Sequence, residues 1–141
     1  MDCSKSIKTS SVAQTVNAGK EFGQSLSETA VVLLKGEMGA GKTHFVKGMA
    51  QGLNIGGNVT SPTFALVNTY DGLYHFDLFR LGDIDDLYAI GFYDYIGLGV
   101  MAIEWAENIP GLEAEFDEYY TVKLDKTSEN ERVITIDYSR T

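Results

Sequence analysis

Residues 30–49, which read AVVLLKGEMGAGKTHFVKGM, decide the fold. The stretch begins with the continuously apolar run 30–34, which is typical of a parallel strand covered on both faces. A glycine-rich segment follows directly, and Phe45, Val46 and Met49 then recur at the spacing of one helix face. The order of strand, glycine-rich segment and helix predicts an α/β fold.

The sequence on either side of this stretch adds further elements. Apolar residues recur every three or four positions over residues 11–26, which predicts a helix. The pair Asp71-Gly72 is typical of a tight hairpin, here between predicted strands over residues 64–70 and 73–79. The later predicted elements are a helix capped by Asp83 and strands over residues 100–103, 119–124 and 132–138. Together, all these elements predict an α/β sheet with antiparallel edge strands.

Residues 36–43 (GEMGAGKT) fit the phosphate-binding pattern G-x-x-x-x-G-K-[S/T], between a predicted strand and a predicted helix. In this context the backbone N–H groups of the loop and the N-terminus of the helix attract phosphate oxygens. The Lys42 ammonium adds a positive charge, and the Thr43 hydroxyl can ligate Mg²⁺. The motif therefore predicts ATP and Mg²⁺ as cofactors. The predicted nucleotide contacts in this region are Glu37, Met38, Gly39, Ala40, Gly41, Lys42, Thr43 and His44.

The motif also sets the expected fold class. We expect a P-loop NTPase-like three-layer sandwich with a mostly parallel central sheet, and a single P-loop ATPase domain over residues 1–141. His44 follows the loop threonine on a helix, where a solvent-facing or locally hydrogen-bonded histidine is a more ordinary interpretation than a catalytic base.

Two carboxylates are candidates for metal and water chemistry. Glu104 ends the apolar strand over residues 100–103, the form in which P-loop proteins bring an acid to the nucleotide; the alternative is a solvated acid at a strand end. Strand alternation places Asp77 with His75 on one face, opposite Phe76. That face would either position metal or water or be an ordinary solvated strand face.

A hydroxyl-rich loop over residues 60–64 (TSPTF) follows the P-loop helix. Such a loop would be able to reach the γ-phosphate as a switch segment does. Its alternative is a plain turn formed by Ser-Pro chemistry.

Composition and charge narrow the function classes. Eleven Lys and Arg against twenty Asp and Glu give a net charge of -9, so the chain repels nucleic-acid phosphates and anionic membrane surfaces. Cys3 is the single cysteine, which excludes an internal disulfide and favours a reducing compartment. No apolar run approaches the length of a membrane span. We therefore expect a cytoplasmic protein that binds neither tRNA nor membranes by itself.

Four motifs follow one another in a fixed order: residues 36–43, 60–64, 75–80 (HFDLFR) and 104–107 (EWAE). In this order they resemble the TsaE family, also called YjeE, over essentially the whole chain. The resemblance implies a Mg-dependent ATPase that works with the proteins TsaB and TsaD in making threonylcarbamoyladenosine at position 37 of tRNA. It also implies that this protein contacts tRNA only as part of the complex with TsaB and TsaD.

The resemblance further implies roles for individual residues. Asp77 and Glu104 would be catalytic, and Thr43 and Glu104 would handle Mg²⁺. Thr63 would belong to a switch-like loop. The remaining positions implied by the resemblance are Trp105 beside the site and Thr15 and Arg132 as nucleotide contacts.

Other classes of protein share parts of this pattern. A small nucleoside or metabolite kinase also combines a P-loop with a compact sheet, but such an enzyme needs more cations than Arg80, Arg132 and Arg140 provide. A GTPase is disfavoured because the sequence has no Asn-Lys-x-Asp guanine motif. A nucleotide-gated interaction module without useful turnover stays open.

Overall fold

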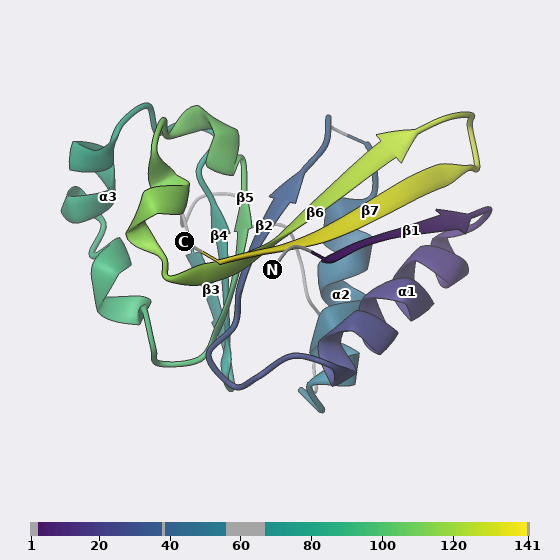
Figure 1. The fold of residues 1–141 in the computed structure, drawn as a ribbon, viewed down its shortest axis with the longest axis horizontal. Helices are drawn as coiled ribbons and strands as arrows, with labels where there is room; N and C mark the ends of the chain where they lie inside the picture. Colours follow the sequence, from purple (N-terminus) through teal and green to yellow (C-terminus); the bar gives the residue numbers. More distant parts are fainter. Residues whose placement is uncertain (1–2, 38, 56–66, 141) are drawn as a thin grey trace.

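Seven strands form one mixed sheet in the computed structural model, which describes residues 3–37, 39–55 and 67–140 (Figure 1). Their order across the sheet is β1-β7-β6-β2-β5-β4-β3. The strands are β1 (Cys3–Thr9), β2 (Val31–Lys35), β3 (Val67–Tyr70), β4 (Leu73–Asp77), β5 (Val100–Glu104), β6 (Glu118–Lys126) and β7 (Arg132–Arg140). The helices are α1 (Val12–Gln24), α2 (Lys42–Gly52) and α3 (Ile84–Ala89), with short 3₁₀ helices η1 (Phe92–Tyr95), η2 (Ala106–Asn108) and η3 (Leu112–Glu115).

The centre of the sheet is parallel and its edges are antiparallel. Strand β2 pairs in parallel with both β5 and β6, and β5 pairs in parallel with β4. The outer strands β1 and β7 on one side, and β3 on the other, are joined by antiparallel pairing. The expected α/β sheet with antiparallel edges is thereby confirmed. The C-terminal ends of β2, β5 and β4 share one edge of the sheet, where strands of this kind place a ligand site.

Apolar clusters cover both faces of the sheet. Val32 and Leu34 of β2 face one cluster, which includes side chains of α1 and α2. Val31 and Leu33 face the other, which includes side chains of α3 and the three 3₁₀ helices. Figure 1 shows α1 and α2 on one side of the sheet and α3 on the other. Burial on both sides explains why the central strand is continuously apolar.

Glycines bring the backbones of α1 and α2 into direct contact. A Cβ atom added at Gly48 of α2 would lie 1.9 Å from the carbonyl oxygen of Val16 in α1. A Cβ atom added at Gly19 of α1 would lie 2.1 Å from the carbonyl oxygen of Phe45 in α2. No side chain fits between the helices at these points. The contact therefore fixes the position of α2, which begins at the end of the glycine-rich loop.

Several element boundaries differ from those expected. The predicted helix over 11–26 is α1, which begins after Ser11, whose hydroxyl accepts the Gln14 backbone N–H at 3.1 Å. The predicted strand over 73–79 is wrong at its end, because β4 stops at Asp77, whose carboxylate accepts the Phe79 backbone N–H at 2.9 Å and forms a turn. Of the strand predicted over 64–70, residues 67–70 are β3 and the rest lies outside the described residues.

Strand β1 has no counterpart in the sequence-based prediction. Its sequence, CSKSIKT, contains mostly polar residues, because β1 is an edge strand that pairs only with β7. Lysines on an exposed edge discourage pairing with other chains, so such a strand lacks the apolar signal of an inner one. Among the helices of the described ranges, none combines the length and apolarity needed to cross a bilayer.

We expect Gly48→Ala to destabilise the protein by about 2 kcal/mol or more in urea unfolding, since the new Cβ atom is fixed to the α2 backbone and clashes with the α1 backbone. This loss outweighs the gain of about 1 kcal/mol that alanine brings to a helix interior. Gly82→Ala is the control, because a Cβ atom there meets nothing within 4 Å. Equal unfolding midpoints for the two variants would contradict the close helix contact.

Candidate functional site

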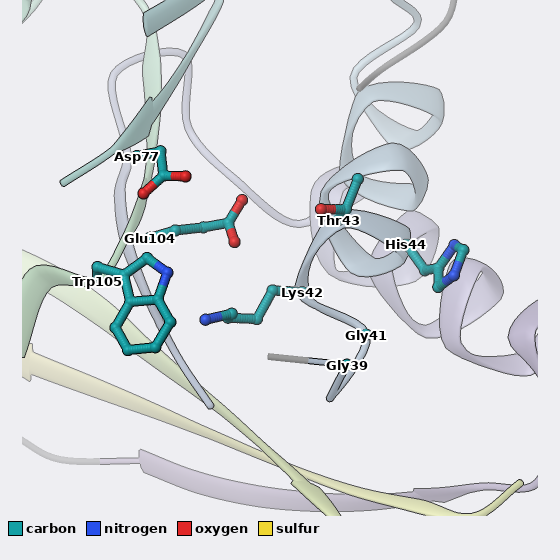
Figure 2. Close-up of a pocket in the computed structure, with 8 residues that line it drawn as sticks. All are labelled: Gly39, Gly41, Lys42, Thr43, His44, Asp77, Glu104 and Trp105. Atoms are coloured by element: carbon teal, nitrogen blue, oxygen red, sulfur yellow. The ribbon is translucent and has the colours of Figure 1, made fainter. Parts of the chain in front are cut away.

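A cleft of about 250 Å³ lies at the C-terminal edge of the parallel strands. Strand β2 runs into the glycine-rich loop, and the register pairs Leu34 with Glu104 and Glu104 with Asp77. The C-terminal ends of three neighbouring strands therefore meet the loop at one place. The residues that line the cleft are Gly39, Gly41, Lys42, Thr43, His44, Asp77, Glu104 and Trp105 (Figure 2).

The loop backbone has a shape that glycine permits. Gly39 and Gly41 have φ values of 85° and 101°, in the left-handed region that side chains rarely adopt. The Ala40 N–H donates to the Glu37 carbonyl at 3.1 Å, and the first turn of α2 starts at Gly41. Space around Gly39 is open, since a Cβ atom there would meet nothing within 4 Å. A helix N-terminus beside an accessible glycine backbone suits an anion.

Lys42 is buried, and its ammonium stays at the cleft. Its Nζ donates a hydrogen bond to the Gly36 carbonyl at 2.6 Å and stands 4.0 Å from the centre of the Trp105 ring. Figure 2 shows the lysine side chain extending from the start of α2 toward that ring. The carbonyl and the aromatic face both stabilise the cation.

Glu104 is not a solvated acid at a strand end, because it is only 4% exposed. Its Oε2 lies 2.5 Å from Nε2 of His75, which is fully buried. The interpretation of His75 and Asp77 as a solvated strand face is therefore wrong for His75. Asp77 is half-buried and lines the cleft, and Figure 2 shows its carboxylate and that of Glu104 on the side of Thr43.

Trp105 adopts a backbone conformation that is rare for its residue type. Its φ of 61° lies in the left-handed region, a strained geometry that persists where surrounding contacts determine it. The ring packs edge-on against Phe79 with centroids 5.0 Å apart, and the Asn108 amide donates to the Phe79 carbonyl at 3.0 Å. These contacts tie the segment after β5 to the segment after β4. They hold the indole at the mouth of the cleft.

The cleft offers oxygen donors that fit Mg²⁺. The hydroxyl of Thr43 and the carboxylates of Asp77 and Glu104 are hard ligands, the kind that Mg²⁺ prefers. No group of three or more His, Cys, Asp or Glu side chains in the described part of the chain could hold a metal ion alone. A magnesium ion with one or two protein carboxylates takes its other ligands from phosphate and water. The residues present thus fit an ion that arrives with a nucleotide.

Arg132 contacts the loop itself. Its Nε donates to the Ala40 carbonyl at 3.1 Å and its Nη2 to the Gly39 carbonyl at 3.2 Å. Nη1 donates to three carbonyls around the β6–β7 turn, those of Ser128, Glu129 and Glu131. The guanidinium therefore connects this turn to the glycine-rich loop. In this structure it acts on the loop backbone, an arrangement that the sequence did not indicate.

A smaller hollow of about 110 Å³ shares Gly39, Gly41 and His44 with the cleft but is not lined by Asp77 or Glu104. Thr15, predicted as a nucleotide contact, borders it but is buried, with its Oγ1 2.8 Å from Oγ1 of Thr9. His44 is exposed, as expected, and borders both hollows. Met38 and Thr63, with the whole loop over 60–64, lie outside the described residues.

Sequence reasoning missed the partnership of His75 with Glu104. Strand alternation correctly placed His75 and Asp77 on one face, but it gave no sign that β5 would bring Glu104 against His75. No local pattern could have revealed this contact, because it depends on the parallel pairing of β4 with β5.

Fold and cleft together define a class: α/β proteins in which a glycine-rich loop joins a central parallel strand to a helix, with acids from neighbouring strands facing that loop. The model of the family described as threonylcarbamoyl adenosine biosynthesis protein TsaE matches residues 9–134. The chain belongs to the TsaE family, whose members take part in the biosynthesis of threonylcarbamoyladenosine in tRNA.

Individual relatives agree with this assignment. A tRNA threonylcarbamoyladenosine biosynthesis protein TsaE from Treponema pallidum is 41% identical over 131 residues, which cover 89% of this chain and 95% of the relative. The protein of the same name from Haemophilus influenzae is 42% identical over 109 residues, 70% of this chain and 69% of the relative. The crystal structure of Bacillus subtilis YdiB superposes with a TM-score of 0.72 at 28% identity, over 97% of this chain and 86% of that one.

We expect Arg132→Lys to lower the free energy of unfolding by about 1 kcal/mol or more. A lysine ammonium cannot donate at the same time to the carbonyls of the glycine-rich loop and to those of the β6–β7 turn, as the guanidinium does. Arg140→Lys is the matched control, since Arg140 is exposed and contacts Glu118 at 3.5 Å. The free energy of unfolding of Arg140→Lys is expected to stay within about 0.5 kcal/mol of the wild-type value. Urea unfolding of both variants measures the difference, and equal losses would contradict the role of Arg132 as a connector.

Proposed function

We propose that this chain binds Mg-ATP in the cleft and hydrolyses it, as the ATPase component of the machinery that makes threonylcarbamoyladenosine in tRNA. The observation that carries the proposal is the meeting of Lys42, Thr43, Asp77 and Glu104 beside the glycine-rich loop. We assign the fold accordingly to the P-loop NTPase-like three-layer sandwiches. Family membership supports the setting in tRNA modification.

Phosphate binding is assigned to the loop and the start of α2. Gly39 and Gly41 give the loop its left-handed turns, the space at Gly39 is open, and the helix N-terminus adds partial positive charge. Lys42, already desolvated at the cleft, adds a full charge. A cation that burial has stripped of water attracts an anion more strongly than an exposed one does.

Hydrolysis is assigned to the acids of β4 and β5. Bound Mg²⁺ would supply charge neutralisation at the phosphates, with Thr43 and Glu104 as its ligands. Asp77 stands at the end of the neighbouring strand, in register with Glu104, and would orient the attacking water. Both acids project from strand ends of the central sheet, so their positions are rigid before nucleotide arrives.

The nucleoside end of ATP is assigned to the smaller hollow beyond the loop. This hollow shares Gly39, Gly41 and His44 with the cleft, so one extended ligand can occupy both. Thr15 and His44 would border the nucleoside. Arg132 would act mainly through the loop carbonyls that it binds.

The proteins TsaB and TsaD are the proposed partners, in the cytoplasm where tRNA is modified. The net charge of -9 disfavours direct binding of tRNA, so tRNA would be reached only through the complex. Few cations of the chain are placed to stabilise the negative charge of the transition state of hydrolysis. The guanidinium of Arg132 already donates to loop and turn carbonyls, and Arg80 is exposed to solvent. A partner would then complete the site, either with a cation or by ordering a loop around the γ-phosphate.

Three substitutions separate binding from turnover. Lys42→Ala is expected to abolish tight ATP binding in calorimetry, because the charged phosphate ligand of the loop is gone. Glu104→Gln and Asp77→Asn are expected to retain nucleotide but to lose most hydrolysis, since they preserve shape and remove the negative charge. If Lys42→Ala binds ATP like the wild type, the nucleotide site lies elsewhere. If both acid variants hydrolyse ATP at the wild-type rate, neither acid has the proposed role.

Hydrolysis by the isolated chain is expected to be slow and to rise when reconstituted TsaB and TsaD are added. In P-loop NTPases a partner-supplied cation is worth about a thousandfold or more in rate. Phosphate release is measured against partner concentration, with Lys42→Ala as the blank. Tight binding without turnover under all conditions would favour a nucleotide-gated interaction module. A fast basal rate that the partners leave unchanged would count against partner stimulation.

A further inference from the structure

His75 has no role in the function proposed so far, although it is among the most deeply buried polar residues of the described chain. It lies in β4 opposite Ala102 of β5, two residues before Asp77. Its side chain shows no exposed surface, and its Nε2 lies 2.5 Å from Glu104 Oε2. The other ring nitrogen, Nδ1, has no hydrogen-bond partner in the described part of the chain.

Burial makes this pair interdependent. A carboxylate that is 4% exposed requires a hydrogen-bond donor, because desolvation of an unpaired charge costs several kcal/mol. An ionised carboxylate only accepts hydrogen bonds, so a hydrogen bond to it across this contact requires the N–H of the His75 ring to be at Nε2. The unpartnered Nδ1 fits this tautomer, since a lone pair without a donor costs less than a buried N–H without an acceptor. Both ring nitrogens therefore favour the tautomer with its N–H at Nε2.

The contact also fixes the carboxylate. The His75 ring contacts Oε2 of Glu104 from the interior of the protein. This is the face of the sheet on which Leu73 and Ala102 belong to the apolar cluster that also contains side chains of α2. Glu104 meanwhile lines the cleft beside Thr43. One carboxylate oxygen is thus anchored in the core, which restricts the directions in which the group can present its other oxygen.

We propose that His75 is a positioning residue, which holds the Glu104 carboxylate in the orientation needed to ligate the Mg²⁺ of bound ATP. The inference rests on the proposed function for the identity of the ion. In other metal-binding proteins, hydrogen bonds to the metal ligands hold those ligands in orientation. Loss of such a hydrogen bond lowers metal affinity or activity by about 10- to 100-fold. A histidine that merely filled the core would have no such effect.

The tautomer is tested first, without nucleotide. His44 and His75 are the two histidines of the sequence, so ¹⁵N-labelled histidine gives two ring spin systems. Long-range ¹H–¹⁵N correlation is expected to show one ring with a protonated Nε2, an unprotonated Nδ1 and a slowly exchanging Nε2 proton. Glu104→Ala is expected to remove the slow exchange. A His75 ring protonated at Nδ1 alone would overturn the proposal.

Function is tested with two amide variants of different reach. The side-chain nitrogen of His75→Gln falls near the place of Nε2 and can still donate to Glu104, whereas that of His75→Asn falls near Nδ1 and cannot. The Mg²⁺ concentration for half-maximal ATP hydrolysis is expected to rise about tenfold or more in His75→Asn and to stay within about twofold in His75→Gln. ATP affinity without Mg²⁺, measured by calorimetry, is expected to be unchanged in both, because the loop is untouched.

Leu73→Ala controls for general destabilisation, since Leu73 is fully buried in the same strand and its side chain has no polar atom that could hydrogen-bond Glu104. Its Mg²⁺ dependence is expected to match the wild type. Equal Mg²⁺ dependence of His75→Asn and His75→Gln would overturn the positioning role while leaving the ATPase proposal intact. A wild-type protein with no Mg-dependent hydrolysis, alone or with partners, would instead overturn the proposed function, and the role of His75 toward Mg²⁺ with it.

Discussion

The parallel pairing of β2, β5 and β4 is the constraint on which the rest of the molecule depends. Parallel strands end at the same edge, so the register places Leu34, Glu104 and Asp77 side by side although they are far apart in sequence. The loop after β2 must then turn back over this edge, which the left-handed glycines allow. A parallel sheet also has to be covered on both faces, and two apolar clusters cover it. Site and core are thus two results of one pairing pattern.

The contacts around the cleft share a second property: each connects elements from different parts of the chain. Arg132 joins the β6–β7 turn to the glycine-rich loop, and His75 joins β4 to β5. Phe79 and Trp105 join the segments that leave those two strands. Because these contacts join separate elements around the cleft, the cleft has its shape before a ligand arrives, which lowers the entropic cost of binding.

The sequence predicted those features that local patterns encode. The glycine-rich motif, the periodicity of α1 and α2 and the apolar run of β2 all depend on residues close to one another, and the structure has these elements near the expected places. Strand β1 could not be predicted in this way, because an edge strand needs no apolar face. The contacts of His75 and Arg132 depend on pairing between distant segments, about which a single sequence carries no local signal. The turn at Asp77 was missed because its cause is one side-chain hydrogen bond, to the Phe79 backbone.

The strand order has a consequence for folding during synthesis. The central strand β2 pairs with β5 and β6 and with neither of its neighbours in sequence, so it has no partner until residues 100–104 have been made. Helices α1 and α2 are complete long before that, and their glycine contact is local enough to form early. A nascent chain that ends before β5 therefore presents the helix pair and the most apolar strand of the protein without a sheet to receive them. Such a strand is prone to pair with other chains, which makes the interval between β2 and β5 the period in which a chaperone has most to protect.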